Sequence, residues 1–266
     1  MQTVRPRVPA RSASRPAAAP AAVDVLATPR VERGDWLDLA RTLAPGSVDL
    51  LYADPPFNTG LTRVGRAGRY ADGFDSPAAH VQWLRERLVA TLPALRPTAS
   101  VLMHVDWRSS HHVRLLLDDL LGADRFVNHL IWSYGLGGSS ARRFARKHDD
   151  IFFYCVDPEA YWFEPPRVPA TSARLRGQLK KSTDVLDIPS INNMARERAG
   201  YPTQKPLALL ERLVRACCPP SGLVLDPCCG SGTTLVAAAR LQRRALGFDA
   251  SAEAVALSRS RLARGT

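Results

Sequence analysis

"GLVLDPCCGSGTTLVAAARLQRRALGFD", residues 222–249, reads as a strand, a tight turn, a helix and a second strand. The apolar run that begins the stretch ends at Asp226, and Gly230, Ser231 and Gly232 then allow the chain to turn sharply. We expect a helix over residues 231–241 and a strand over 243–249 that ends at Asp249. A unit of this kind is typical of a parallel sheet covered by helices.

The same alternation of strands and helices runs through most of the chain. Ser76 is a good N-cap with Pro77 in the first turn, which predicts the start of a helix. Short turns between alternating elements predict an α/β, Rossmann-like fold, with an open, mostly parallel sheet and helices on both faces. The predicted strands are 48–53, 100–106, 126–134 and 150–156, and the predicted helices are 76–96, 109–122, 205–218 and 251–263.

Two stretches depart from this pattern. Residues 1–27 are rich in Pro, Ala and Arg without periodicity, which is typical of a disordered basic tail. Residues 28–266 are then one domain, and inside it the periodicity fades over 135–200, where the chain is basic and irregular. We expect a small inserted region there, between a part at 28–134 and a part at 201–266.

The charge of the chain favours a polyanionic partner. The 36 Lys and Arg outnumber the 25 Asp and Glu and leave a net charge of +11. Only four of these cations are lysines, so the arginine-rich usage of a GC-rich genome explains part of the excess. No apolar stretch is long enough to cross a membrane and no secretory signal is present, so we expect a cytoplasmic, nucleoid-associated protein.

The five cysteines predict no metal site. They include two adjacent pairs and lack the Cys-x-x-Cys spacing of zinc ligands. We expect reduced, mostly buried thiols at 155, 217, 218, 228 and 229.

The glycine turn after Asp226 predicts a ligand site. A phosphate loop is excluded because no Lys follows Gly232, and a carboxylate at Asp226 would repel the pyrophosphate of a dinucleotide. A ligand with a positive amino group near a ribose fits better, because Asp249 stands where such folds hold ribose hydroxyls. S-adenosylmethionine is a ligand of this kind, and a purely structural turn is the alternative.

A second strand end carries an unusual set of residues. In "LYADPPFNTG", residues 51–60, an apolar strand stops at Asp54 and is followed by Pro55, Pro56 and Phe57. The prolines fix the backbone beside the carboxylate. A turn that only caps a strand would explain the prolines, but not an acid and an aromatic ring.

Together, "ADPPF", "YPTQKP" and "LDPCCGSGTT" resemble the amino-methyltransferases of DNA. The order, with the catalytic motif first and the cofactor motif last, is similar to the β-class of that family. The likeness extends over residues 30–264, which leaves out the tail. It implies an S-adenosylmethionine-dependent methyltransferase fold, with a catalytic part at 28–134, a DNA target-recognition region at 135–200 and a cofactor-binding part at 201–266.

The resemblance also implies roles for individual residues. Asp226 would meet the methionine amino group, Asp249 the ribose hydroxyls, and Lys205 with Thr203 the methionine carboxylate. Asp35 is expected at the adenine end of the cofactor, although a helix N-cap is an equal alternative. The cofactor-binding residues implied are Asp35, Thr203, Lys205, Asp226, Pro227, Gly230, Ser231, Gly232, Thr233 and Asp249.

The chemistry expected of the first motif is the activation of an aromatic amine. Asp54 and the carbonyl of Pro55 would accept the two N–H groups, localise the nitrogen lone pair and stabilise the developing charge. Phe57 would stack on the base, which must first be flipped out of the duplex. The sequence departs from the family at Phe57, where Tyr is commoner, and at Cys228, where Phe is frequent.

We therefore expect a site-specific enzyme that methylates the N6 amine of adenine in double-stranded DNA. The N4 amine of cytosine is the alternative, although such enzymes more often carry Ser in place of Asp54. RNA or protein-amide methylation and a basic DNA-binding module with a vestigial cofactor fold are weaker alternatives. A homodimer and a cognate restriction enzyme are compatible partners.

Three basic stretches are candidates for contact with DNA. The first, residues 60–70, is expected to be a loop. The others are residues 142–148 and 167–181, which lie in the irregular region. The predicted contacts are Arg63, Arg66, Arg69, Arg142, Arg143, Arg146, Lys147, Arg174, Arg176, Lys180 and Lys181.

Overall fold

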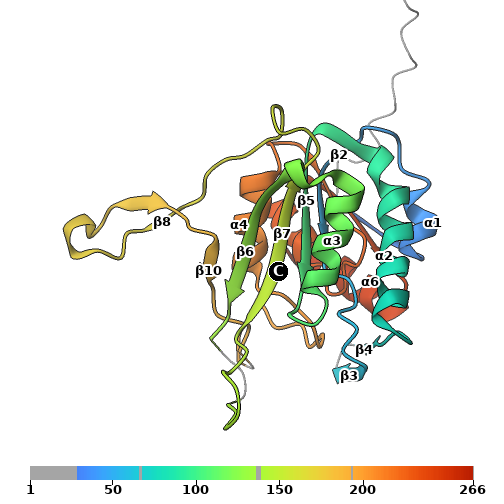
Figure 1. The fold of residues 1–266 in the computed structure, drawn as a ribbon, viewed down its shortest axis with the longest axis horizontal. Helices are drawn as coiled ribbons and strands as arrows, with labels where there is room; N and C mark the ends of the chain where they lie inside the picture. Colours follow the sequence, from blue (N-terminus) through green and yellow to red (C-terminus); the bar gives the residue numbers. More distant parts are fainter. Residues whose placement is uncertain (1–28, 66–67, 136–138, 193, 266) are drawn as a thin grey trace, which may run out of the picture.

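The computed structural model describes residues 29–65, 68–135, 139–192 and 194–265, arranged around one eight-stranded sheet (Figure 1). The predicted tail at 1–27 and Arg66 lie outside the described residues. The helices are α1 (Trp36–Ala40), α2 (Pro77–Thr91), α3 (Ser110–Leu121), α4 (Leu207–Cys217), α5 (Thr233–Arg240) and α6 (Ala252–Arg264). The strands are β1 (Arg30–Arg33), β2 (Val48–Ala53), β3 (Leu61–Gly65), β4 (Gly68–Asp72), β5 (Leu95–Val105), β6 (Phe126–Ser133), β7 (His148–Cys155), β8 (Arg167–Pro169), β9 (Leu179–Lys181), β10 (Val185–Asp187), β11 (Leu223–Asp226) and β12 (Arg244–Asp249).

The order of strands in the main sheet confirms the predicted topology. The strands follow one another as β1-β12-β11-β2-β5-β7-β6-β10, and every neighbouring pair is parallel except the two that involve β7. β2 and β11, which are far apart in the sequence, pair directly, with Leu50 opposite Val224 and Leu51 opposite Leu225. Their carboxyl ends therefore meet at one edge of the sheet.

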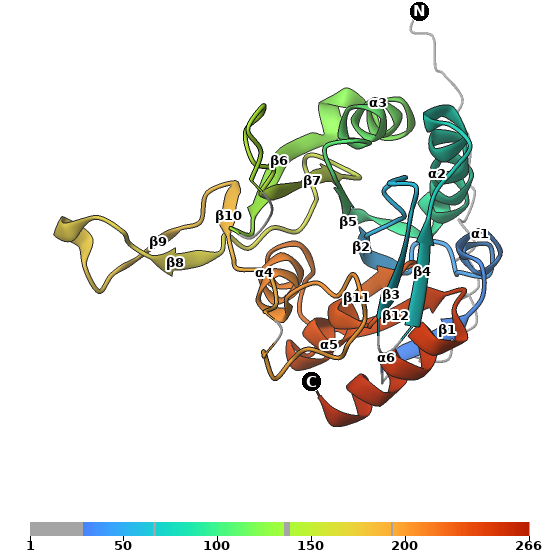
Figure 2. The ribbon, with the colours of Figure 1, turned by 90° about the horizontal axis from the view of Figure 1, so that it is seen from below.

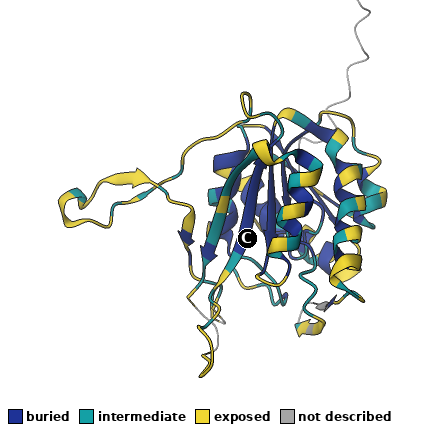
Figure 3. Ribbon diagram, viewed as in Figure 1, coloured by how far each residue is buried: buried dark blue, intermediate teal, exposed yellow. Residues whose placement is uncertain are grey.

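Helices cover both faces of the sheet, as the sequence predicts. Figure 2 shows α1, α2 and α3 on one side and α4, α5 and α6 on the other. Two apolar cores lie between these layers and the sheet, and the central strands are dark in the burial view (Figure 3). All six residues of β2 are buried, as expected of a parallel strand with helices on both sides.

The structure corrects two expectations near the catalytic motif. The predicted loop at 60–70 contains a hairpin, in which β3 pairs antiparallel with β4. The predicted helix over 76–96 ends at Thr91, and a short 3-10 turn with Pro93 leads straight into β5. Proline has no N–H to continue the helical hydrogen bonds, which explains the early end.

The inserted region contains a long exposed hairpin. β8 and β9 pair antiparallel and project away from the sheet in both ribbon views (Figures 1 and 2). β10 then returns to the edge of the main sheet and pairs parallel with β6. No helix within the described residues is long and apolar enough to cross a membrane.

Candidate active site

Three carboxylates stand at the carboxyl ends of three adjacent parallel strands. Asp54 directly follows β2, Asp226 ends β11, and Asp249 ends β12. Because β2, β11 and β12 are neighbours in this order, the three side chains come to one edge of the sheet. The two motifs found in the sequence therefore meet at one edge of the sheet.

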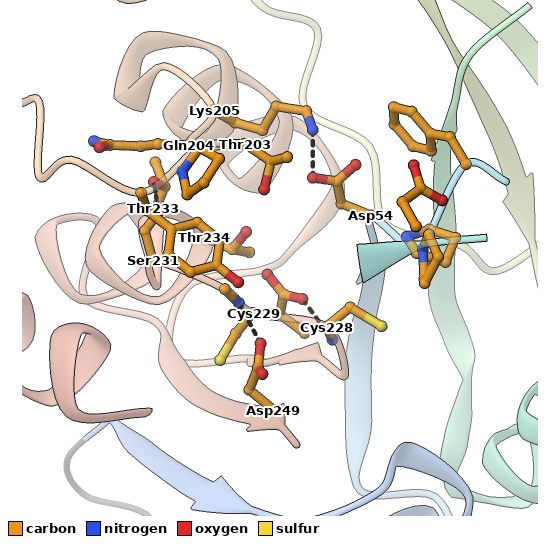
Figure 4. Close-up of a pocket in the computed structure, with 18 of the residues that line it drawn as sticks. Asp54, Thr203, Gln204, Lys205, Cys228, Cys229, Ser231, Thr233, Thr234 and Asp249 are labelled. Carbon is orange, nitrogen blue, oxygen red and sulfur yellow. Dashed lines mark hydrogen bonds and ion pairs between the residues drawn. The ribbon is translucent and has the colours of Figure 1, made fainter. Parts of the chain in front are cut away.

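These carboxylates line one cavity of about 730 Å³ (Figure 4). Loops from both ends of the chain form its walls, including the segment that contains Thr203 and Lys205. Phe57 and three further aromatic residues, Trp83, Trp132 and Tyr134, add apolar surface. The predicted site residues that line it are Asp35, Asp54, Pro55, Pro56, Phe57, Thr203, Lys205, Asp226, Pro227, Gly230, Ser231, Thr233 and Asp249.

The turn between β11 and α5 depends on glycine. Gly230 and Gly232 have φ angles of +50° and +75°, in the left-handed region that other residues seldom adopt. A Cβ on Gly232 would also lie 2.7 Å from Oγ of Ser258, so the position has no room for a side chain. The turn therefore presents bare backbone to the cavity at Gly230, as the sequence predicts.

Asp226 is a buried carboxyl group with a shifted pKa. Its side chain is only 2% exposed, and burial raises its pKa to about 7. The backbone N–H of Cys228 donates to its Oδ1 over 3.1 Å, which opposes that rise. A cationic ligand group in the cavity would relieve the cost of the buried charge.

Asp249 has a structural task beside any role with a ligand. Its two oxygens accept the backbone N–H groups of Gly230, at 2.9 Å, and of Ser251, at 2.8 Å. Burial raises the pKa of its carboxyl group, and these two hydrogen bonds lower it. The acid thus links the glycine turn to the start of α6 and still faces the cavity.

Asp54 forms an ion pair with Lys205, which approaches from the opposite wall (Figure 4). Both side chains are largely buried, at 16% and 12% exposed. The ammonium group of Lys205 also lies 5.2 Å from the ring centroid of Phe57. The structure therefore brings together the residues predicted for catalysis and the lysine predicted for the cofactor.

A buried polar chain lies behind Phe57 and was missed by the sequence analysis. His104 is fully buried and stacks near Phe57, with ring centroids 5.9 Å apart. Its Nε2 lies 3.2 Å from Oδ2 of Asp149, and its Nδ1 lies 2.9 Å from the hydroxyl oxygen of Tyr52. Since Asp149 can only accept when ionised, Nε2 donates to it, and in a neutral ring Nδ1 then accepts from the tyrosine hydroxyl. This chain holds the ring of His104 in one orientation.

Asp35 is engaged within the protein. Its Oδ1 accepts the N–H of Leu37 over 2.8 Å, so it caps α1, which was the alternative role considered for it. Nη2 of Arg87 donates to both carboxylate oxygens, at 2.9 and 2.7 Å. Asp35 still lines the cavity, beside Trp36 and Trp83.

Side chains behind the glycine turn were also missed. Arg261 of α6 is buried, and its Nη1 donates to the carbonyl of Ser231 and to Oγ1 of Thr233, at 2.8 and 2.9 Å. The hydroxyl groups of Ser231 and Thr233 thus face this arginine as well as lining the cavity. Tyr201 packs against Gly230 from the other side, since a Cβ there would lie 3.1 Å from its ring.

The candidate DNA contacts fall into three separate places. Arg63 and Arg69 lie on the β3–β4 hairpin, and Arg146 lines the cavity. The loop before β7 carries Arg142, Arg143 and Lys147 near the same edge of the sheet. The β8–β9 hairpin carries the exposed side chains of Arg174, Arg176, Lys180 and Lys181.

Comparison with known proteins agrees with this geometry. The family profile described as DNA methylase, for N6 and N4 enzymes, matches residues 48–260, which is most of the chain. The type II methyltransferase M.ScaI of Streptomyces caespitosus is 26% identical over 237 residues, covering 81% of this chain and 75% of its own. The DNA adenine methyltransferase YhdJ of Escherichia coli is 26% identical over 245 residues, covering 86% and 81%.

Solved structures share the fold. The cytosine-N4-specific PvuII DNA methyltransferase superposes with a TM-score of 0.67 at 18% identity, covering 89% of this chain and 93% of its own. TTHA0409 of Thermus thermophilus, in complex with S-adenosylmethionine, gives 0.62 at 23% identity, covering 90% and 96%. The strand order and the two motifs at one sheet edge agree with the family match. This chain therefore belongs to the family of N6- and N4-specific DNA methylases, which are dependent on S-adenosylmethionine.

Proposed function

We propose that this chain methylates the N6 amine of adenine in double-stranded DNA, with the N4 amine of cytosine as the alternative. The observation that carries the proposal is that Asp54 shares one cavity with Asp226 and Asp249. The first carboxylate suits an amine that must be activated, and the other two suit a cofactor with a cationic methionine end and a ribose. The residue at position 54 favours adenine, because enzymes that act on the N4 amine of cytosine more often carry a serine there, which is a weaker acceptor than the carboxylate of Asp54.

The cavity fits S-adenosylmethionine on the chemistry of its walls. Asp226 is a buried carboxyl group whose charge needs a cationic partner, and the ammonium group of the cofactor is one. Gly230 contributes only backbone to the cavity wall, and the ring of Tyr201 packs beside it. Asp249, held by two backbone N–H groups, retains lone pairs for ribose hydroxyls. When bound, the cofactor supplies an electrophilic methyl group on a sulfonium.

Asp54 acts on the base. Its carboxylate accepts one N–H of the exocyclic amine, and the carbonyl of Pro55 accepts the other. Two acceptors placed off the base plane draw the nitrogen towards tetrahedral geometry, so that its lone pair can attack. The prolines restrict φ and hold the carbonyl in place before the substrate arrives. Phe57, backed by His104, offers the stacking surface for the base.

Lys205 has two successive partners in this proposal. In the structure it neutralises Asp54. Within the same cavity it can exchange that carboxylate for the one on the methionine end of the cofactor, as its TQKP segment lines the wall beside Asp226. Asp54 is then free to accept from the amine. This exchange would make cofactor binding precede productive binding of the base.

The base must leave the duplex to reach Asp54, which is largely buried in the wall of the cavity. The exposed cations of the inserted region, together with Arg63 and Arg69 of the β3–β4 hairpin, are the proposed phosphate contacts. M.ScaI is named as a type II methyltransferase, which suggests a cognate restriction enzyme as a further partner. A homodimer is compatible with the fold, and sedimentation of the purified chain tests it.

Nucleoside analysis tests the proposal. The purified chain and isotope-labelled S-adenosylmethionine are incubated with unmethylated genomic DNA, which is then digested and separated by mass spectrometry. We expect labelled N6-methyldeoxyadenosine, absent when Asp54→Ala replaces the wild type. If labelled N4-methyldeoxycytidine were the only product, the substrate would be the N4 amine of cytosine and not the N6 amine of adenine. No transfer together with no heat of cofactor binding would favour the vestigial DNA-binding module.

A further inference from the structure

Phe144 is the most exposed large apolar residue among those the structure describes. Its side chain is 98% exposed, on the loop that joins β6 to β7. Burial of an aromatic ring is normally favourable by a few kcal/mol, so this ring would stabilise a complex in which a partner covered it. The surroundings of the ring identify that partner.

The loop lies at the edge of the sheet where the strand ends that line the cavity meet. β6 runs parallel to β5, because both are antiparallel to β7, so its last residue stands at the same edge as Asp54. The base of the loop is closed by two hydrogen bonds. The N–H of Tyr134 donates to the carbonyl of Lys147 over 3.1 Å, and Nζ of Lys147 donates to the carbonyl of Gly135 over 2.9 Å.

The same loop is joined to the cavity wall. Arg146 lies two residues after Phe144, lines the cavity, and stacks over the ring of Trp107 at 3.4 Å from its centroid. Trp107 also lines the cavity. Phe144 is therefore two residues from the cavity wall, on a segment that this stacking contact joins to the wall.

The positive charge beside Phe144 favours a polyanion as the partner of this ring, over the apolar surface of a protein or the interior of a membrane. Arg142 and Arg143 precede it, and both are exposed. Within the part of the chain that the structure describes, no carboxylate lies within 4.0 Å of the guanidinium groups of Arg142, Arg143 or Arg146. An exposed ring beside arginines that form no ion pair with a carboxylate of the described residues suits insertion between stacked bases, while the arginines contact the phosphates.

We propose that Phe144 is the wedge that enters the duplex at the target base pair and fills the space that the flipped base leaves. The inference rests on the proposed function, because it assigns a residue to the flipping step of that reaction. Arg142 and Arg143 hold the flanking phosphates, and the ring replaces the lost stacking. Phe144 touches the DNA and not the reacting atoms, so it is a positioning residue.

The test separates flipping from binding and from chemistry. It uses a duplex that contains the methylation site found by modification-sensitive sequencing. Phe144→Ala, Phe144→Leu and the control Leu115→Ala are compared with wild type. Leu115 is an exposed apolar residue of α3 that does not line the cavity. Single-turnover methyl transfer is measured on the paired duplex and on one with an abasic site opposite the target. Fluorescence of 2-aminopurine at the target position reports flipping.

We expect Phe144→Ala to slow transfer on the paired duplex about tenfold or more and to abolish the rise in fluorescence. The abasic duplex has no pair to break, so it should restore the rate of this variant to near that of wild type. Phe144→Leu should retain most of the rate, and Leu115→Ala should match wild type. An equal loss on both duplexes, or wild-type fluorescence in Phe144→Ala, would overturn the wedge. A wild-type chain that methylates no DNA would instead overturn the proposed function.

Discussion

The glycine turn after β11 and the loop before β7 flank the same cavity but are built in opposite ways. Around the turn, Asp249 accepts two backbone N–H groups and Arg261 is buried against Ser231 and Thr233. Around the β6–β7 loop, Phe144 and its neighbouring arginines are exposed. The wall at the glycine turn is held by hydrogen bonds within the chain, whereas the loop presents exposed side chains to solvent.

This difference fits the two ligands in our proposal, the cofactor at the glycine turn and the duplex at the loop. A small cofactor of constant shape is best held by groups that are already in place, because little further ordering is then needed on binding. A duplex must be bent and opened, so the groups that contact it benefit from freedom to follow its shape. Asp54 stands between the two walls, which makes it the sharpest place to test the comparison.

The largest expected effect is at Asp54. Asp54→Ala should lower methyl transfer by about 10²–10³-fold or more, because one of the two acceptors of the amine is lost. Affinity for S-adenosylmethionine, measured by calorimetry, should stay within a few-fold of wild type, since the carboxylate serves the base. Near-normal turnover by this variant would remove Asp54 from the proposed mechanism. A collapse of cofactor affinity would place Asp54 with the wall that holds the cofactor.

The next effect is at Asp226. Asp226→Asn should weaken S-adenosylmethionine binding by roughly 1.5–3 kcal/mol, or about ten- to a hundredfold, because a charged hydrogen bond is lost. Asp49→Asn is the matched control, since Asp49 is equally buried but accepts the N–H of Leu223 away from the cavity. That control should lower thermal stability and leave affinity unchanged. Equal affinities of wild type and Asp226→Asn would contradict the assignment.

The third effect is a pH dependence. Burial raises the pKa of Asp226 to about 7, whereas the cofactor's ammonium requires the ionised form. Affinity should therefore rise with pH up to about 7 and then level off, changing by up to about tenfold per pH unit below that value. Asp226→Asn should flatten the profile measured by calorimetry between about pH 5.5 and 8.5. A wild-type profile that is flat below the pKa of Asp226 would show that another group carries the interaction.

The same shift affects stability without cofactor, with the opposite sign. Between the ordinary pKa of 3.8 and about 7, the folded protein keeps a proton on Asp226 that the unfolded chain releases. This carboxyl group therefore makes folding less favourable as pH rises through that window. Saturating cofactor should remove this contribution, which melting curves with and without S-adenosylmethionine would show.

The smallest effect is expected on the projecting hairpin. Arg174→Ala with Lys180→Ala should reduce the slope of log affinity for DNA against log salt by about 0.9 for each phosphate that the variant no longer neutralises. Arg41→Ala at the end of α1 removes an exposed cation from the side away from this hairpin and should not change the slope (Figure 2). An unchanged slope in the hairpin variant would leave the β6–β7 loop and the β3–β4 hairpin as the DNA contacts.

Much of the cavity wall around the glycine turn after β11 could be predicted from the sequence, because short-range patterns determine its structure. The run from Gly222 to Asp249 contains a strand, a turn that needs left-handed glycines and a helix start, and all are found in place. β2 pairs directly with β11, which brings the two motifs to one edge of the sheet. The sequence placed both motifs at strand ends of a parallel sheet, where loops meet at one edge.

The rest depends on contacts between distant residues. His104 lies in an apolar strand, so its role is visible only when Asp149 and Tyr52 arrive from neighbouring strands. Arg261 is a charged residue of a helix, so the sequence favours a solvent-exposed position for it. In the structure it is buried and donates to the carbonyl of Ser231. The β3–β4 hairpin lacks the alternating apolar residues that mark a strand in the sequence, so its antiparallel pairing became visible only in the structure. Lys205, which was predicted to contact the cofactor, lines the cavity. Its ion pair with Asp54 could not be predicted, because the two residues lie far apart in the sequence.

The pairing of β2 with β11 has a consequence for synthesis of the protein. The N–H of Leu223 donates to Oδ2 of Asp49 over 2.8 Å and across 174 residues of chain. During translation, the half that contains Asp54 emerges long before the strand that completes its sheet. We therefore expect polypeptides released early by the ribosome to lack Asp226 and Asp249, and so to be unable to hold a methyl donor or modify DNA.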